Sequence, residues 1–383
     1  MAAATKYFIC SLCVLLLAAC GGSGGRADMS EFCEVLYSPR YAGGFEILGA
    51  EGRQSTILRV HNPWQGAEGI DTELFIARGG ESAPAGFTGQ VLHGAARRVV
   101  CMSSTHVAMM DAAGAIESVV GVSVADYITN EHIAARRDST VDVGYEGNIN
   151  YELLTAARPD IVLLYGLNGA SGMEGKLREL RIPFAYIGDY LEQSPLGKAE
   201  WMVAVGEIAG CRERAESLYE PIPQRYAALR ELAATASSKA PAVMLNTPYG
   251  DSWFMSPPNT YAARLIADAG GDYLYTGNSS TRSLPVDIEQ ASLMVSRADV
   301  WLNVGRFTSL EELRSALPRF AGARCVREGR VWNCDRRTNA AGGNDYWESG
   351  IVRPDVILRD LIKIFHPELL PDDTELVYYR RLE

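Results

Sequence analysis

The feature that most constrains the fold is a repeated alternation of short apolar runs with helical stretches in the central and C-terminal parts of the chain. Val99–Met102 predicts a strand, His106–Ala113 a helix, and Val119–Val122 the next strand. The alternation starts again at Ala242–Asn246. Such a pattern is typical of a parallel sheet covered by helices, so we expect an α/β protein with two lobes.

A long helical segment separates the two blocks. Lys198–Ala209 and Arg212–Ala236 both have helical patterns. Pro221 and Pro223 lie within the second stretch, and they must kink or break it because proline lacks the backbone N–H of a helical hydrogen bond. Ligands of open α/β sheets bind at the carboxyl ends of the strands, which predicts a cleft between the lobes.

A small β-rich annex is expected before the first lobe. Short runs of β-branched and aromatic residues, separated by Gly, Pro and Asn, predict antiparallel strands there. These runs are Phe32–Tyr37, Phe45–Leu48, Ser55–Val60 and Thr72–Ala77, with Gly79–Gly89 as the closing loop. The predicted divisions are a signal peptide (1–19), a flexible tether (20–30), the annex (31–90), an N-terminal lobe (97–197), a bridging helical segment (198–238) and a C-terminal lobe (240–383).

The N-terminus carries a candidate export signal. Residues 6–20 read KYFICSLCVLLLAAC, an apolar run that is too short to span a bilayer and is typical of a secretory signal. Its end, Leu17-Ala-Ala-Cys20, resembles the lipobox of bacterial lipoproteins, which implies cleavage before Cys20 and lipidation of its thiol. An ordinary signal peptide with a chance cysteine is the alternative. We expect a periplasmic or cell-surface protein, anchored to a membrane through Cys20.

The composition argues against nucleic-acid binding, bare metal ions and catalysis. The net charge is −11 and no Lys/Arg block occurs, so no basic surface for nucleic acid is expected. The 5 histidines are scattered, which predicts no metal site. No phosphate-binding P-loop occurs, and the nearest Ser/His/Asp grouping shares one helix start. We therefore predict no enzyme activity, no catalytic residues and no cofactor.

Two of the cysteines form a candidate disulfide. Arg324–Trp332 is expected to be a hairpin that turns at Glu328-Gly329. Cys325 and Cys334 flank this turn and would be cross-strand neighbours.

Several stretches of the chain, in their order and spacing, resemble bacterial ABC-importer solute-binding proteins of the group that takes ferric siderophores, haem and cobalamin. These stretches are Arg97–His106, Asn150–Leu154, Arg158–Val162, Asp268–Gly271, Glu289 with Ala298–Val300, Gly329–Val331 and Leu361–Glu368. The annex and residues 336–349 resemble a Bacteroidetes-type variety of these lipoproteins. The resemblance implies two three-layer α/β lobes bridged by a long helix, and an ABC permease with its ATPase as partners. It also implies that an acidic residue on the first lobe docks onto the permease, and Glu174 lies near the expected place.

Strand-end loops of the first lobe supply the first set of candidate ligand-binding residues. A Ser/Thr cluster starts a helix, where free N–H groups favour an anionic group, although simple helix capping explains it equally well. Tyrosines at successive strand ends suit flat, conjugated or chelate ligands, whereas packing is the more frequent role of any single tyrosine. The candidates are Ser103, Ser104, Thr105, Tyr145, Tyr165, Asn168 and Tyr190.

The second lobe offers aromatic and arginine side chains. Arginine presents a forked donor to carboxylate, phosphate or catecholate oxygens. A solvated surface loop is the alternative for the Gly-rich stretch before the last helix. The candidates are Tyr249, Trp253, Arg306, Arg336, Arg337 and Trp347.

The sequence thus favours a solute-binding lipoprotein that captures a metal chelate in the cleft and delivers it to a membrane permease. A ferric siderophore is the first choice of ligand, with haem and cobalamin as the others. Two rival hypotheses stay open. The first is a surface-displayed chelate-binding or adhesion module without a permease, and the second is a chelate-processing hydrolase on the same fold.

Overall fold

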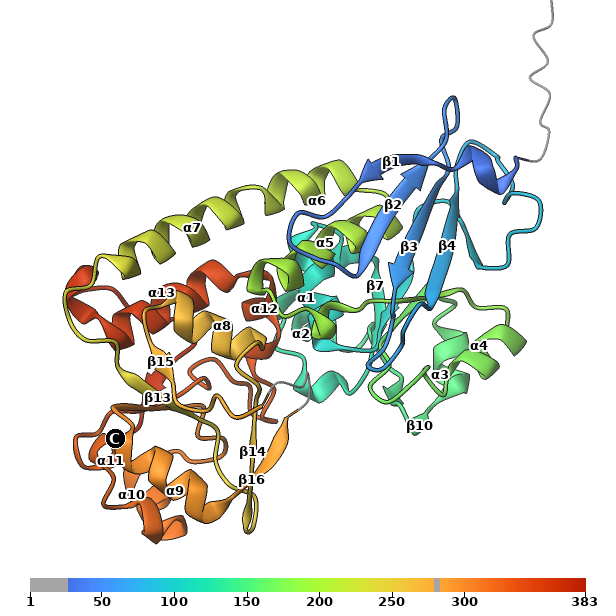
Figure 1. The fold of residues 1–383 in the computed structure, drawn as a ribbon. Helices are drawn as coiled ribbons and strands as arrows, with labels where there is room; N and C mark the ends of the chain where they lie inside the picture. Colours follow the sequence, from blue (N-terminus) through green and yellow to red (C-terminus); the bar gives the residue numbers. More distant parts are fainter. Residues whose placement is uncertain (1–26, 279–282) are drawn as a thin grey trace, which may run out of the picture.

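The computed structural model describes residues 27–278 and 283–383, which form two α/β lobes with a β annex on the first (Figure 1). The predicted signal peptide and Cys20 lie outside the described residues. Within those residues, no helix combines the length and the apolar character needed to cross a membrane.

The first lobe is built on a parallel five-stranded sheet, as the alternation predicted. The strand order is β12-β11-β6-β7-β8, and every neighbouring pair is parallel. The strands are β6 (Val99–Cys101), β7 (Val119–Val122), β8 (Val141–Asp142), β11 (Ile161–Leu164) and β12 (Phe184–Tyr186). The helices are α1 (Ser104–Ala112), α2 (Glu131–Ala135), α3 (Tyr151–Ala156) and α4 (Glu174–Glu179), and a short hairpin is formed by β9 (Gly144–Tyr145) and β10 (Asn148–Ile149). All the strands end on one edge of the sheet, so their following loops share that edge.

The second lobe repeats this plan with one antiparallel strand. Its sheet has the order β15-β13-β17-β18-β19, and the last pair is antiparallel. The strands are β13 (Ala242–Leu245), β15 (Asp272–Tyr273), β17 (Val300–Leu302), β18 (Val331–Asn333) and β19 (Arg380–Arg381), and a separate antiparallel pair is formed by β14 (Ser252–Met255) and β16 (Leu284–Asp287). The helices are α8 (Tyr261–Asp268), α9 (Ile288–Arg297), α10 (Leu310–Ala316), α11 (Arg324–Arg327), α12 (Ser349–Val352) and α13 (Pro354–Phe365).

The expected hairpin at Arg324–Trp332, and the disulfide that depended on it, are wrong. Residues 324–327 form the helix α11, and β18 pairs with β17 and β19 instead of with residues 324–327. Cys325 and Cys334 are therefore not cross-strand neighbours. Both are buried free thiols, and burial raises the pKa of each.

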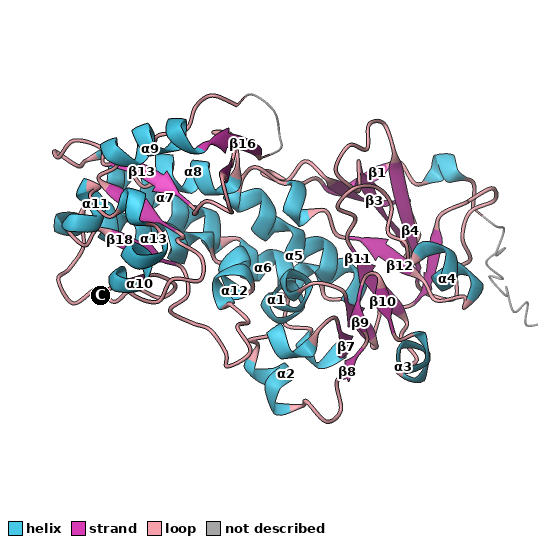
Figure 2. Ribbon diagram, turned by 90° about the horizontal axis from the view of Figure 1, so that it is seen from below, coloured by secondary structure: helices cyan, strands magenta, loops and turns pink. Residues whose placement is uncertain are grey.

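The helical segment has three parts: α5 (Pro195–Ala209), α6 (Arg212–Tyr219) and α7 (Pro221–Ala234). Every residue of α5 is buried, and this helix packs against α1, α6, α8 and α12 at the centre of the molecule (Figure 2). α6 and α7 run along the outside from the first lobe to the second (Figure 1). Pro221 opens α7, where its missing N–H costs no hydrogen bond, so the predicted break falls between two helices.

The annex is a five-stranded sheet with the order β1-β2-β3-β4-β5. Its strands are β1 (Glu34–Tyr37), β2 (Phe45–Gly49), β3 (Thr56–His61), β4 (Asp71–Ala77) and β5 (Gln90–His93), and β5 runs parallel to β4. Leu58 and Val60 on one face join the main hydrophobic core, while Ile57 and Phe75 on the other face form a second cluster. The annex is thus part of the first lobe's core.

The buried carboxylate of Glu200 in α5 fastens the annex to the first lobe. Its Oε1 accepts hydrogen bonds from the Tyr37 hydroxyl and the Arg40 N–H, both at 2.8 Å. Its Oε2 accepts from the N–H groups of Tyr41 and Ala42, also at 2.8 Å. One donor from the end of β1 and three from the β1–β2 connection thus converge on one side chain, which fixes the annex against α5.

Candidate functional site

A cavity of about 460 Å³ lies where the annex, the first lobe and the second lobe meet. The annex contributes Gly43, Gly44 and residues 61, 62 and 64–67; the first lobe contributes Leu167, Gly188 and residues 190–193; α5 contributes Trp201; and the second lobe contributes Asn259, Thr260 and Tyr261. The first-lobe residues follow β11 and β12, so the cavity opens at the carboxyl ends of the strands. This is the edge at which open α/β sheets bind ligands.

Tyr190 is the predicted ligand-binding residue that lines this cavity, and its hydroxyl is already engaged. It accepts a hydrogen bond from the Gln65 N–H at 3.2 Å and donates one to the carbonyl oxygen of Gly166. Burial raises the pKa of Tyr190 to about 12, so the phenol is neutral near pH 7. Its ring face, not its hydroxyl, is what remains for a ligand.

One carboxyl group, that of Glu192, belongs to the cavity lining. Its Oε1 accepts hydrogen bonds from Gly43 N at 3.0 Å, Gly44 N at 3.1 Å and Trp201 Nε1 at 3.0 Å. Burial raises the pKa of Glu192, while these bonds oppose the rise. Among the described residues that line the cavity there is no lysine or arginine. The charge of Lys198, which lies behind this lining, also opposes the rise in the pKa of Glu192. The described lining is therefore neutral to negative.

The Ser/Thr cluster at the start of α1 is used within the protein. Ser103 Oγ caps the helix by accepting from Thr105 N at 3.2 Å, and Thr105 Oγ1 donates to Asp189 at 3.4 Å. Ser104 is half-buried in the first turn. The helix-capping explanation accounts for the contacts of Ser103, and a ligand-binding role for these three residues stays a prediction.

A buried ammonium group connects the first lobe with the second. Lys198 Nζ donates to the carbonyl oxygen of Asp189 at 2.9 Å, lies 3.8 Å from its carboxylate, and sits 5.6 Å from the centre of the Tyr261 ring. Burial raises the pKa of Asp189 and lowers that of Lys198, and each group partly offsets the shift of the other. Since Tyr261 begins α8, this contact ties the base of the site to both lobes.

Three further candidates lie on other strand-end loops of the first lobe. Tyr145 is 56% exposed and Asn168 is also exposed, so both side chains are free to meet a ligand. Tyr165 is half-buried and contacts the ring of His106 edge-on, with the ring centres 6.4 Å apart. His106 itself is fully buried, and burial lowers its pKa to about 3. None of these residues lines the cavity of about 460 Å³.

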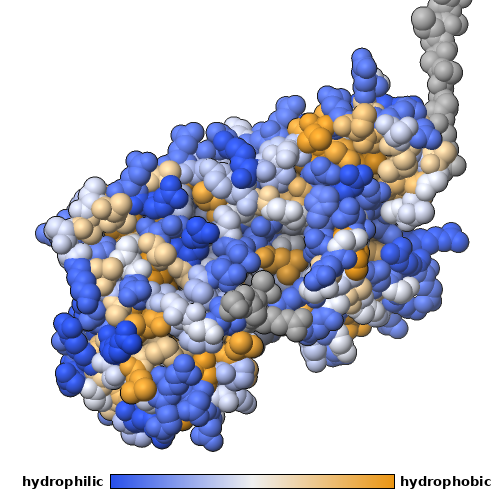
Figure 3. All heavy atoms as spheres, in the orientation of Figure 1, coloured by the Kyte–Doolittle hydropathy of each residue, from blue (hydrophilic) through white to orange (hydrophobic). Residues whose placement is uncertain are grey.

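Trp253 does not face the cleft, which corrects the expectation for this residue. It is fully buried, stacks on Trp301 with ring centres 5.6 Å apart, and donates to the carbonyl oxygen of Leu245 at 3.0 Å. Because side chains alternate along a strand, its neighbour Phe254 points the other way and is 51% exposed. Hydrophilic side chains predominate on the face shown in Figure 3, with apolar side chains between them.

Tyr249 and Arg306 are the candidates that the second lobe leaves open to solvent. Tyr249 is 84% exposed. The Arg306 guanidinium lies over the Phe307 ring at 5.6 Å and forms no ion pair within the part of the chain that the structure describes. Arg306 can therefore offer its donors to an anionic group.

The Gly-rich loop before α12 joins the two lobes. Arg337 Nε is 2.8 Å from the Asp345 carboxylate, and Arg336 Nη2 is 3.3 Å from Glu375. Trp347 is partly exposed and packs edge-on against Tyr346 at 4.6 Å. Both arginines therefore already hold carboxylates, and their role as a ligand clamp stays a prediction.

The same loop meets the first lobe through Thr129. Its N–H and its hydroxyl donate to Glu348 Oε2 at 2.7 and 2.8 Å. Glu348 is 1% exposed, and its Oε1 has no hydrogen-bond partner among the described residues. Burial raises the pKa of Glu348 to about 7, and the nearby Asp345 carboxylate adds to the rise. This interlobe contact thus contains a carboxyl group that titrates near neutral pH.

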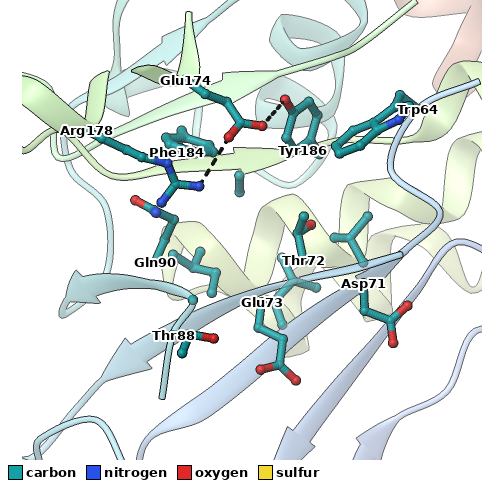
Figure 4. A pocket seen from close by; sticks show the side chains of 15 residues that line it. Trp64, Asp71, Thr72, Glu73, Thr88, Gln90, Glu174, Arg178, Phe184 and Tyr186 are labelled. Carbon is teal, nitrogen blue, oxygen red and sulfur yellow. Dashed lines mark hydrogen bonds and ion pairs between the residues drawn. The ribbon is translucent and has the colours of Figure 1, made fainter. Parts of the chain in front are cut away.

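A second cavity, of about 450 Å³, lies between the annex and the first lobe (Figure 4). Glu174, the candidate for permease docking, accepts from the Tyr186 hydroxyl at 2.6 Å and lies 3.2 Å from Arg178. Its carboxylate therefore points into this cavity, toward β4 (Figure 4). Permease docking by Glu174 stays a prediction. In the described residues, no group of three His, Cys, Asp or Glu side chains is placed to hold a metal ion.

Sequence reasoning missed most of the residues that line the interlobe cavity. Trp64 and Gln65 lie in an annex loop, and their contacts with Tyr186 and Tyr190 join positions far apart in the chain. The sequence signal that could have indicated this contact is the position of Trp64 in a short Pro/Gly-containing loop, where a large aromatic side chain has no local core to pack into. Thr260 and Tyr261 begin a helix, and no sequence pattern indicated that this helix faces the annex.

Comparisons with known proteins bear on the fold and the family. Residues 99–338 match the family described as periplasmic binding protein. An uncharacterized lipoprotein of Methanocaldococcus jannaschii is 26% identical over 282 residues, which cover 71% of this chain and 65% of the relative, so the match spans just under two thirds of that protein.

Solved structures with low sequence identity share the fold. A periplasmic heme-binding protein from Pseudomonas aeruginosa has a TM-score of 0.57 and 20% identity, and the match covers 75% of this chain and 98% of that one. The periplasmic vitamin B12-binding protein of Vibrio cholerae has a TM-score of 0.50 and 16% identity, with 70% of this chain and 96% of that one covered.

Proposed function

Because this chain belongs to the periplasmic binding protein family, we propose that it captures a metal chelate between its lobes and delivers it to a membrane permease. Binding is non-covalent and no reaction is catalysed. The ligand is a ferric siderophore, haem or a corrinoid.

One observation carries this proposal: the cavity of about 460 Å³ has walls from both lobes and opens at the carboxyl ends of β11 and β12. Its volume falls within the roughly 300–1,000 Å³ of typical small-molecule sites. A ligand held by Tyr190 on one lobe and Thr260 on the other stabilises one relative position of the lobes. That position is what a permease recognises as the loaded state.

Aromatic side chains on both lobes support a flat or macrocyclic ligand. Tyr145 on the first lobe and Tyr249 and Phe254 on the second are more than half exposed, so their ring faces are open to a ligand. Aromatic faces contribute large contact areas to conjugated ligands. The haem- and vitamin B12-binding proteins that share the fold support the same class of ligand for this chain.

The proposed partners are an ABC permease and its ATPase. Lipidation of Cys20 would keep the protein at the membrane surface, and the relative that carries the name lipoprotein supports this location. Exposed acidic residues on the first lobe would contact the permease. Glu174 remains a candidate for this contact, although it already binds Tyr186 and Arg178.

The experiment that tests the proposal is ligand titration of the chain lacking residues 1–20. Hemin, cyanocobalamin and a ferric tris-catecholate are each titrated while tryptophan fluorescence and the ligand's absorption spectrum are followed. We expect saturable binding of at least one chelate, with weaker binding by Tyr190→Ala and Thr260→Ala, which change the cavity wall on each lobe. Glu34→Ala, at an exposed position of β1 outside the cavity, is the control. Failure of every chelate to bind would refute the proposal.

A further inference from the structure

The loop that joins β3 to β4 does not extend into solvent but folds onto the first lobe. Asn62 N donates to the carbonyl oxygen of Ile70 at 2.7 Å, and Ala67 N donates to that of Trp64 at 3.0 Å. Asn62 has a φ of 46°, in the left-handed region where asparagine is tolerated better than most residues. The loop therefore has a defined shape of its own.

Two contacts place this loop at the carboxyl ends of β11 and β12. Trp64 meets Tyr186, the last residue of β12, edge-on with ring centres 5.3 Å apart. The Gln65 N–H donates to Tyr190, and a Cβ added to Gly166 would lie 3.1 Å from the Cβ of Trp64. A residue larger than glycine at position 166 would crowd the loop, so the two segments are closely fitted.

The loop also forms a wall of the interlobe cavity. Trp64, Gln65 and Ala67 line it on one side, and Asn259 and Thr260 of the second lobe line it on another. Trp64 also lines the neighbouring cavity of about 450 Å³, where Figure 4 shows its ring beside Tyr186, so this residue belongs to the walls of both cavities. A ligand that enters between the lobes meets the annex as well as the two sheets.

The charges of the lining restrict which part of a ligand can enter. The described part of the lining includes no lysine or arginine, and its one acidic side chain is Glu192. Glu192 uses Oε1 for three N–H groups, while Oε2 receives no hydrogen bond from the described residues. His61, the remaining titratable group besides tyrosines, is 2.9 Å from the Asp71 carboxylate and 3.8 Å from that of Glu46. An anionic group would meet no cationic side chain among the described lining residues, and Lys198 behind the lining is already paired with Asp189. An amide N–H₂, in contrast, could donate to Glu192 Oε2.

We propose that the loop Asn62–Ile70 is a specificity element of the ligand site, and that the cavity it walls accepts an uncharged, hydrogen-bond-donating edge of a chelate. This inference rests on the proposed function and narrows it to chelates whose periphery carries carboxamide groups. The annex is fastened to α5 by Glu200, so the loop is a fixed wall against which the second lobe closes.

The test compares cyanocobalamin, which carries carboxamides, with hemin, which carries two carboxylates, on the full chain purified in detergent. We expect wild type to bind cyanocobalamin more tightly than hemin. Trp64→Ala should weaken cyanocobalamin binding about tenfold or more, as expected for an aromatic contact at the centre of a site. Glu192→Gln keeps an acceptor for the annex and should shift the preference toward hemin by about threefold to tenfold. Val35→Ala, at a position of the annex that is 54% exposed, is the matched control.

A further variant keeps the test valid if Trp64→Ala does not fold. Gln65→Ala removes the side chain but keeps the backbone N–H that binds Tyr190, so the loop should stay in place while cyanocobalamin binding weakens. Tighter binding of hemin than of cyanocobalamin by wild type would overturn this inference and leave the proposed function standing. The inference would also be overturned, with the proposed function still standing, if Gln65→Ala and a correctly folded Trp64→Ala both bound cyanocobalamin as tightly as wild type. Absence of any chelate binding would overturn both.

Discussion

Replacing Glu348 by glutamine should remove a pH dependence from the stability of the protein. Glu348 is 1% exposed, and burial raises its pKa from 4.5 to about 7. Its Oε2 accepts from Thr129, and glutamine can keep that bond through its amide oxygen. The nearby Asp345 carboxylate disfavours a negative charge on residue 348, and the uncharged amide of glutamine avoids this repulsion.

The magnitude follows from the shift in pKa. The folded state binds the proton more tightly than the unfolded state, so this group's contribution is fully present below about pH 4.5 and is lost as the pH rises through about 7. A rise in pKa from 4.5 to about 7 corresponds to roughly 3 kcal/mol in total, and most of this disappears between pH 5 and pH 8. Glu348→Gln should therefore be more stable than wild type by about 3 kcal/mol at pH 8 and by about 1 kcal/mol or less at pH 5.

The assay is urea unfolding of both proteins at pH 5 and pH 8, with the interlobe contact followed by fluorescence. Glu375→Gln is the control, because Glu375 is an exposed partner of Arg336 at the surface and should leave the pH dependence unchanged. Equal pH dependence in wild type and Glu348→Gln would refute the assignment of the titration to this residue.

Three further predictions concern the annex, the second lobe and the cysteines. Glu200→Ala should lower the free energy of unfolding by about 3–5 kcal/mol because four hydrogen-bond donors lose their acceptor. A melting temperature only about one or two degrees below that of wild type would contradict this reasoning. Trp253→Ala should lower the free energy of unfolding by about 3–5 kcal/mol because it leaves an empty space in the core. Phe254→Ala, on the exposed face of the same strand, should change it by about 0.5 kcal/mol or less. Equal losses for the two variants in chemical denaturation would contradict the placement of the two rings. A thiol reductant should leave the melting temperature unchanged because Cys325 and Cys334 are free, and a lowered value would indicate a bridge.

The sequence was sufficient to predict the two-lobed α/β fold. The apolar runs Val99–Met102 and Ala242–Asn246 contain the strands β6 and β13, whose residues are buried except for the partly buried first residue of β13, and local hydrophobicity alone identifies them. The Ser103 cap of α1 was also evident, since capping depends on neighbours two residues away. These features are specified by short stretches of chain.

Features that depend on distant partners could not be predicted in this way. Trp253 lies in an exposed-looking Gly/Asp/Ser stretch, and only its packing on Trp301 shows that its face of β14 is the inner one. The Glu-Gly pair within residues 324–332 suggested a hairpin between two adjacent strands. In the structure β18 pairs with β17 and β19, which are distant in the chain, and residues 324–327 form a helix instead of a strand. The role of Trp64 depends on Tyr186, which is 122 residues later in the chain.

The position of the annex also bears on how far the chain can be shortened. β12 is the edge strand of the first-lobe sheet, and β4 of the annex lies beside it. Removing the annex would uncover the backbone of β12 together with the surface against which Leu58 and Val60 pack. An exposed strand edge next to an apolar surface is a template for aggregation. The smallest fragment that stays monomeric should therefore begin at the annex, and one trimmed to the two lobes should precipitate or pair through β12.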